Sequence, residues 1–124
     1  MKTVRWLAIA LLLSMGLWAA AAQDNSAPQV AQSTVQKIEM KASRFQFTPS
    51  TIRVKAGVPV ELRIVSTDAV HGLAIQGLNI NQRLDPGKEV VITFTVAKAG
   101  RYPFFCSIMC GSGHAGMKGE LIAE

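Results

Sequence analysis

Aromatic and charged side chains are scarce in this chain, and cysteine is scarcer still. Of its 124 residues, 6% are aromatic, 17% are charged, and only two are cysteines, Cys106 and Cys110. No internal repeat is visible, and the long apolar stretches are confined to the N-terminus. The length and these absences exclude a large multidomain enzyme and a polytopic membrane protein.

Clustered positive charge is also missing. The formal charge of +5 comes from 13 Lys and Arg against 8 Asp and Glu, and two of the cations, Lys2 and Arg5, precede the first acid. The remainder is only mildly basic, and no Lys/Arg cluster is interleaved with aromatic residues. These features predict no nucleic-acid partner.

The first 22 residues have the pattern of an export signal. Lys2 and Arg5 form a basic start, residues 6–17 are apolar except for Ser14 and Gly16, and four alanines at 19–22 supply small residues for cleavage before Gln23. An uncleaved anchor is the alternative, because residues 6–22 are at the short end for a membrane span. We therefore expect a periplasmic or otherwise extracytoplasmic protein, with a possible membrane tether through residues 1–22.

The rest of the chain divides into a linker and one folded domain. Residues 23–36 are polar and show no period, which predicts a flexible linker. Residues 37–124 alternate apolar and polar positions, most clearly over 58–65 and 90–96, with turn signals such as Asp85-Pro86-Gly87. No segment has a 3.6-residue period of helical length. This pattern predicts an all-β sandwich of about seven or eight strands.

The residues able to bind a soft metal are gathered near the C-terminus. Cys106, Cys110, His114 and Met117 fall within twelve residues, and the remaining histidine, His71, follows the strand at 58–65. Three glycines interrupt this stretch, so a loop is favoured over a helix. Thiolate, thioether and imidazole together favour copper, and two thiolates allow more than one copper ion, because sulfur can bridge.

Two simpler interpretations compete with copper. Exported cysteines form disulfides by default, and Cys106 and Cys110 would close a small loop. Alternatively, His71, Cys106, Cys110 and His114 make a complete Cys₂His₂ set for zinc. Met117 has no role in either interpretation, and copper exceeds zinc in intrinsic affinity.

The metal-binding stretch resembles a known family. Gly100-Arg101-Tyr102-Pro103-Phe104-Phe105-Cys106 is similar to the run that leads into the metal loop of cupredoxins. The loop from Cys106 to Met117 resembles the binuclear copper A loop of cytochrome c oxidase subunit II, and Thr67-Asp68-Ala69-Val70-His71 resembles the segment that supplies its upstream histidine. The resemblance covers residues 37–124 and implies a Greek-key, cupredoxin-like sandwich.

The resemblance also implies a ligand set. Two copper ions would be bridged by the sulfurs of Cys106 and Cys110, and each ion would take one imidazole, from His71 or His114. Met117 would be a weak axial ligand to one ion, and the carbonyl oxygen of Ile108 would be the weak ligand to the other.

The chain departs from that family at several points. Position 108 is usually Glu and is Ile here, a change that a backbone ligand tolerates. The tryptophan through which the family takes up electrons has no counterpart after residue 22, and no acidic docking surface for a basic cytochrome is evident.

The expected function is one-electron transfer through a copper A-type centre, with a cytochrome or an oxidase subunit as redox partner. The chain would be an electron carrier and not an enzyme in its own right, because the ligand positions leave no open site for substrate. A mononuclear copper-binding or copper-delivery protein is the alternative function.

Overall fold

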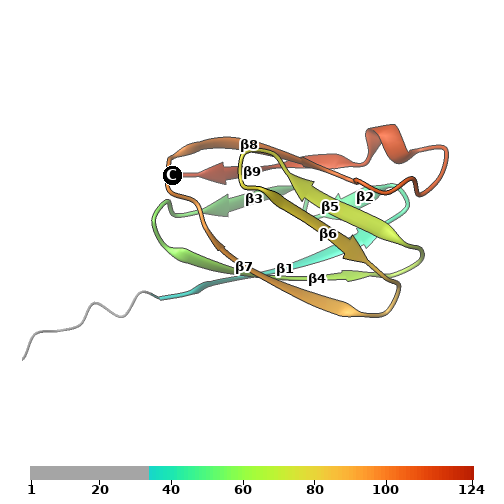
Figure 1. Cartoon of the computed structure of the whole chain (residues 1–124), viewed down its shortest axis with the longest axis horizontal. Helices are drawn as coiled ribbons and strands as arrows, with labels where there is room; N and C mark the ends of the chain where they lie inside the picture. Colours follow the sequence, from blue (N-terminus) through green and yellow to red (C-terminus); the bar gives the residue numbers. More distant parts are fainter. Residues whose placement is uncertain (1–33) are drawn as a thin grey trace, which may run out of the picture. The chain divides into compact units, whose positions relative to one another are not determined.

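The computed structural model describes residues 34–124 (Figure 1). The predicted signal or anchor at 1–22 and the predicted linker up to residue 33 lie outside this range. Within it, the first strand begins at Gln36, one residue before the predicted start of the domain. No helix among the described residues is long and apolar enough to span a bilayer.

Nine strands and one short 3-10 turn make up the described chain. They are β1 (Gln36–Ser43), β2 (Gln46–Thr48), β3 (Thr51–Val54), β4 (Pro59–Ser66), β5 (His71–Ile75), β6 (Ile80–Leu84), β7 (Glu89–Thr95), β8 (Gly100–Phe105), η1 (His114–Gly116) and β9 (Lys118–Ala123). The all-β prediction is confirmed. The count exceeds seven or eight because β2 has only three residues and because Asn81, Gln82 and Arg83 in β6 are consecutive polar residues.

The strands form two sheets that pack face to face. One sheet has the order β2-β1-β4-β7 and the other β3-β9-β8-β5-β6. Strand β1 runs parallel to β4, and β3 runs parallel to β9, whereas the other pairs are antiparallel. These parallel pairs require the chain to cross between sheets, as it does in Greek-key sandwiches.

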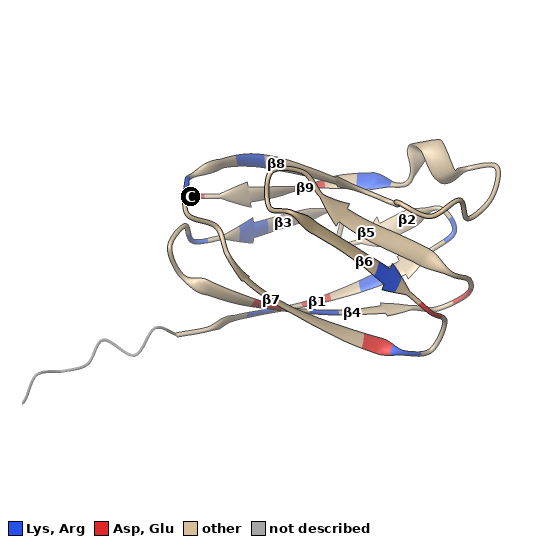
Figure 2. Cartoon of the chain, viewed as in Figure 1, with Lys and Arg blue, Asp and Glu red and all other residues tan. Residues whose placement is uncertain are grey.

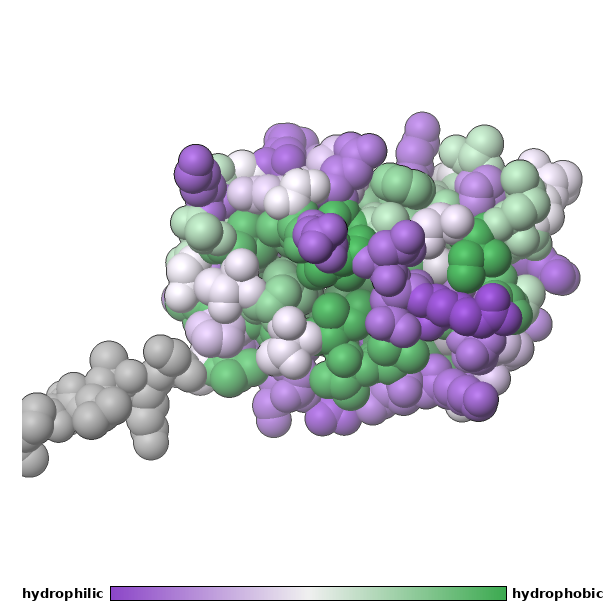
Figure 3. All heavy atoms as spheres, viewed as in Figure 1, coloured by the Kyte–Doolittle hydropathy of each residue, from purple (hydrophilic) through white to green (hydrophobic). Residues whose placement is uncertain are grey.

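Alternation along each strand produces the core between the sheets. In β4, Val60, Leu62 and Ile64 are completely buried, while Glu61 and Arg63 on the opposite face remain partly exposed. Phe47 on β2 and Phe104 on β8 meet edge to face, with ring centroids 5.3 Å apart. In Figure 3, hydrophobic residues are visible through the middle of the face, with hydrophilic residues above and below them and across part of the right half. The pattern is that of two half-buried sheets sharing one core.

Three connections meet at one end of the sandwich. They are the β1–β2 turn, the segment between β4 and β5, and the long loop between β8 and β9, which carries η1 (Figure 1). The backbone N–H of Thr67, just after β4, donates to the carbonyl of Ala42 near the end of β1 (3.0 Å). This end of the fold therefore places His71 beside the cysteine-containing loop.

Candidate metal centre

The loop from Cys106 to Met117 is held closed at its base. The backbone N–H of Cys106 donates to the carbonyl of Met117 at 3.0 Å, directly beyond the last paired residues of β8 and β9. Inside the loop, His114 N–H donates to the carbonyl of Gly111 (3.1 Å). The segment is a loop with a single 3-10 turn, as its glycine content predicts.

The two cysteines form the middle of the site. Their side chains are buried, with Cys106 2% and Cys110 7% exposed, and both are free thiols. The two Sγ atoms lie 3.6 Å apart. Burial raises the pKa of the Cys110 thiol, and the neighbouring Cys106 raises it further. A metal that binds the Cys110 sulfur as a thiolate therefore has to displace its proton.

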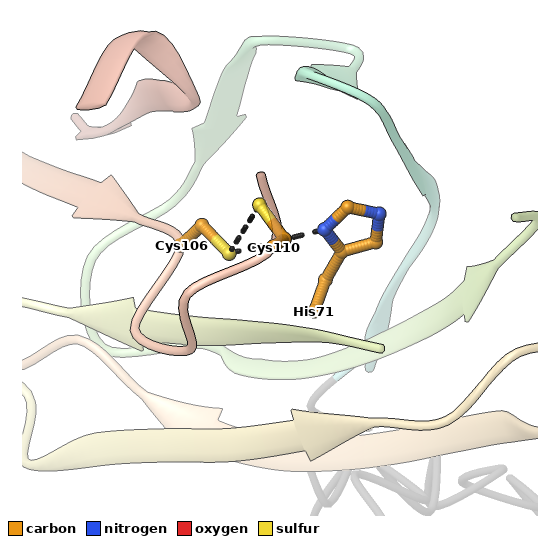
Figure 4. A group of neighbouring side chains, drawn as sticks. All are labelled: His71, Cys106 and Cys110. Atoms are coloured by element: carbon orange, nitrogen blue, oxygen red, sulfur yellow. Dashed lines mark hydrogen bonds between the residues drawn. The ribbon is translucent and has the colours of Figure 1, made fainter. Parts of the chain in front are cut away.

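His71 lies on one side of this pair. Its side chain is fully buried at the start of β5, and Nδ1 is 3.9 Å from Cys106 Sγ. The ligand atoms of His71, Cys106 and Cys110 all lie within 4.8 Å of one another, and Figure 4 shows the three side chains pointing toward a common centre. Residues 35 positions apart in the sequence thus form one compact donor group.

Asp68 fixes the orientation of the His71 ring. Its Oδ1 lies 2.8 Å from His71 Nε2, and its Oδ2 accepts a hydrogen bond from the backbone N–H of Arg44 at 2.7 Å. The Arg44 N–H and then the His71 ring hold the pKa of the Asp68 carboxyl below its ordinary value. An ionised carboxylate only accepts hydrogen bonds, so His71 donates from Nε2 and leaves Nδ1 free to face the sulfurs.

His114 and Met117 lie on the other side of the cysteine pair. His114 Nδ1 is 3.6 Å from Cys110 Sγ, and Met117 Sδ is 3.9 Å from the same sulfur. Met117 is 1% exposed, whereas His114 is partly exposed. His114 lies outside the compact group of His71, Cys106 and Cys110 and reaches the site through Cys110.

The carbonyl oxygen of Ile108 completes the set. It lies 3.1 Å from Cys106 Sγ, so the exchange of the family's usual Glu for Ile leaves a backbone oxygen beside the sulfur. All six residues named from the sequence are therefore brought together. The donor set of two thiols, two imidazoles, a thioether and a carbonyl fits copper, for which soft sulfur and imidazole donors are favoured.

Sequence reasoning missed two supports of the site. The sequence marks Asp68 only as a carboxylate close to His71 along the chain, and not as the partner of its ring. Ser107 Oγ hydrogen-bonds with Asn81 Oδ1 on β6 at 2.7 Å, which ties the start of the loop to the neighbouring strand. An acid three residues before a candidate histidine ligand is a signal that could have identified Asp68.

The loop itself carries no charged residue. No Lys, Arg, Asp or Glu occurs from Cys106 to Met117, and Figure 2 shows the charged residues on the strands and on the other turns. Met109 is 76% exposed and Phe105 37% exposed. The surface of the loop itself is thus uncharged and partly apolar, while the charged residues Arg44 and Lys118 lie beside it.

Comparisons with known proteins agree with this architecture. A family model described as "Cupredoxin-like domain" matches residues 8–123. Two cytochrome c oxidase subunit 2 sequences from Thermus thermophilus are each 32% identical over 109 residues, or 88% of this chain, and the match covers 78% of one and 63% of the other. The chain therefore spans less than two thirds of the second relative.

A solved structure gives the same result in three dimensions. A chain from a heme-copper terminal oxidase dimer, determined by cryo-electron microscopy, superimposes with a TM-score of 0.66 and 30% identity. The match covers 72% of this chain and 65% of that chain.

Proposed function

The chain belongs to the cupredoxin-like family and is a homologue of cytochrome c oxidase subunit II, and from this we propose that it transfers single electrons through a copper A-type pair. In this proposal His71, Cys106, Ile108, Cys110, His114 and Met117 hold two copper ions. The homology itself supports copper as the metal. The number of ions, the ligand roles and the redox partner are parts of the proposal.

One observation carries the proposal of two ions. The side chains form an unbroken series in which His71 contacts Cys106, Cys106 contacts Cys110, and Cys110 contacts His114. A single tetrahedral ion requires its four donors close to one another, but His114 lies outside the compact group of the other three. Two central sulfurs with one imidazole on each side instead match a pair of ions that share both thiolates.

The protein contributes fixed positions and exclusion of water. Bound copper would supply a one-electron redox couple. The chain buries His71, both cysteines and Met117, and it holds the His71 ring through Asp68. Donors held in this way move little when the charge at the site changes, and small reorganisation favours electron transfer.

The surface around the loop suggests how a redox partner docks. We propose that a cytochrome or an oxidase subunit meets the uncharged loop through apolar contacts such as Met109. Electron transfer should then depend only weakly on ionic strength, because long-range charge attraction contributes little. A steep fall in rate with added salt would contradict this mode of docking.

We also propose an extracytoplasmic location, reached through the leader-like residues 1–22. Mass measurement of the N-terminus of protein purified from membrane and soluble fractions tests it. A soluble form beginning at Gln23 indicates cleavage, whereas an intact N-terminus in the membrane fraction indicates a tether.

Copper loading tests the central proposal. The purified protein is reduced, loaded with copper and examined by metal analysis and by electron paramagnetic resonance. We expect two coppers per chain and a hyperfine pattern in which one unpaired electron is shared equally by two copper nuclei. One copper per chain, with the spectrum of a single nucleus, would contradict the paired centre and favour the mononuclear alternative.

A further inference from the structure

The β1–β2 turn touches both halves of the candidate site. Arg44 and Phe45 form this two-residue turn, between the paired residues Ser43 and Gln46. We propose that the turn is a clamp that fixes the His71 side and the Cys110–His114 side relative to each other, with Phe45 as its positioning residue. This inference rests on the proposed metal-binding function and adds residues that contribute no ligand.

The clamp holds the His71 side through the backbone. The N–H of Arg44 donates to Asp68 Oδ2, and Asp68 Oδ1 in turn receives the hydrogen bond from His71 Nε2. The carboxylate thus binds both the turn and the imidazole, so displacing the turn would remove one of the hydrogen bonds that locate the carboxylate.

The clamp holds the loop through the Phe45 ring. A Cβ atom built on Gly111 would lie 2.8 Å from Phe45 Cζ, and one built on Gly113 would meet the same ring more closely. The ring therefore occupies the space that side chains at these two positions would need. Gly111 follows Cys110 directly, and Gly113 precedes His114, so the contact is made between two proposed ligands.

This packing serves two purposes. It restrains the backbone that carries Cys110 and His114, which a glycine-rich loop does not restrain by itself. It also places a partly buried apolar ring against the loop that carries the thiols, in contact with the hydrophobic core. Because Arg44 in the same turn also binds Asp68, movement of the turn would loosen both sides of the site together.

A matched pair of glycine variants tests the contact. Gly113 has φ −92° and ψ 6°, a conformation that non-glycine residues adopt in type I turns, so the Phe45 ring is the main obstacle to a methyl group there. Gly116 lies in the same 3-10 turn, and nothing is within 4 Å of the position that a Cβ atom would take there. In copper-loaded protein, Gly113→Ala should speed copper release to a Cu(I) chelator about tenfold and alter the visible spectrum, while Gly116→Ala should stay within about twofold of the unmodified protein.

Removing the ring completes a double-mutant cycle. Phe45→Ala should also speed copper release, whereas Phe45→Leu should release copper at a rate close to that of the unmodified protein. Adding Gly113→Ala to Phe45→Ala should increase the rate of copper release little further, because the methyl group enters the space that the ring has left. Phe94→Ala, a partly buried phenylalanine on β7, is the control for a general loss of stability and should leave the spectrum unchanged.

A metal-free measurement separates this inference from the proposed function. The thiols of the reduced protein are treated with a disulfide reagent, and Phe45→Ala should react several-fold faster than Phe94→Ala. Equal reactivity, equal effects of Gly113→Ala and Gly116→Ala, or simple additivity of Phe45→Ala and Gly113→Ala would each overturn the clamp. Failure of the unmodified protein to bind copper would instead overturn the proposed function, while the thiol measurement would still decide on the clamp.

Discussion

The body of the sandwich and its metal-binding end are held together in different ways. In the body, aliphatic side chains from regular strands pack in a continuous core, as Leu62 and Ile64 do on β4. At the metal end, the buried groups are sulfurs and an imidazole supplied by loops and strand ends. They are positioned by specific contacts, such as the hydrogen bonds of Asp68.

This contrast separates stability from function. Losing one aliphatic contact in the body weakens the whole fold but leaves the donor positions of the remaining folded molecules intact. Losing one contact at the metal end barely changes the buried apolar area, yet it changes the distances on which metal binding depends. Substitutions in the two regions should therefore affect different measurements.

The largest effect is expected when a central sulfur is removed. Cys110→Ser deletes the thiol that contacts Cys106, His114 and Met117 in the structure, so the paired copper spectrum should disappear. Far-ultraviolet circular dichroism should show that the β-sandwich persists, because the strands do not depend on this side chain. Retention of a shared-electron copper signal in Cys110→Ser would refute the bridging role.

A core substitution tests the other side of the comparison. Leu62→Ala leaves a cavity at a fully buried position and should lower the free energy of unfolding by about 2–5 kcal/mol, measured by denaturant titration. Val91→Ala on the half-exposed face of β7 is the control and should lower the free energy of unfolding much less. The copper spectrum of folded Leu62→Ala should match the unmodified protein; an altered spectrum would show that core and site are not separable.

The sequence identifies much of the body because alternation is a local property. The strands at 58–65 and 90–96 follow a period of two, and β4 and β7 occupy these segments. Strand β6 could not be predicted, since Asn81, Gln82 and Arg83 are polar and the strand is defined by its pairing with β5. The parallel pairing of β1 with β4 is likewise a property of the three-dimensional arrangement, and no local pattern reveals it.

The site shows the same division between local and distant information. Cys106, Cys110, His114 and Met117 lie in one motif, and His71 is the remaining histidine of the chain. The family resemblance adds the carbonyl of Ile108. The roles of the β1–β2 turn could not be predicted, because Arg44 and Asp68 are 24 residues apart and Phe45 contacts the loop through glycines that have no side chain. Their contact arises only when three connections meet at one end of the sandwich.

A smaller effect is expected from the carboxylate behind His71. Asp68→Ala removes the acceptor that orients the ring, and it should weaken copper binding about 10–100-fold in competition with a chelator. Asp68→Asn retains one oxygen acceptor, so its copper affinity should lie between those of Asp68→Ala and the unmodified protein.

A surface acid provides the control for that variant. Asp85 pairs with Arg83 at 2.9 Å on an exposed part of the chain, so Asp85→Ala should leave copper affinity unchanged. If Asp68→Ala and Asp85→Ala bind copper equally well, the orienting role of Asp68 is wrong.

The smallest effect is expected for an ion pair on the surface of the body. Arg101 on β8 donates to both carboxylate oxygens of Glu120 on β9, at 3.1 and 3.0 Å, but the two side chains are 72% and 35% exposed. Water and salt screen such pairs, so Arg101→Ala should lower the free energy of unfolding by less than about 1 kcal/mol, and by still less near 1 M salt. The copper spectrum should not change, because β8 and β9 remain paired through their backbones. A loss as large as that of Leu62→Ala would mean that charge pairs across β8 and β9, and not the apolar core alone, hold the body of the sandwich together.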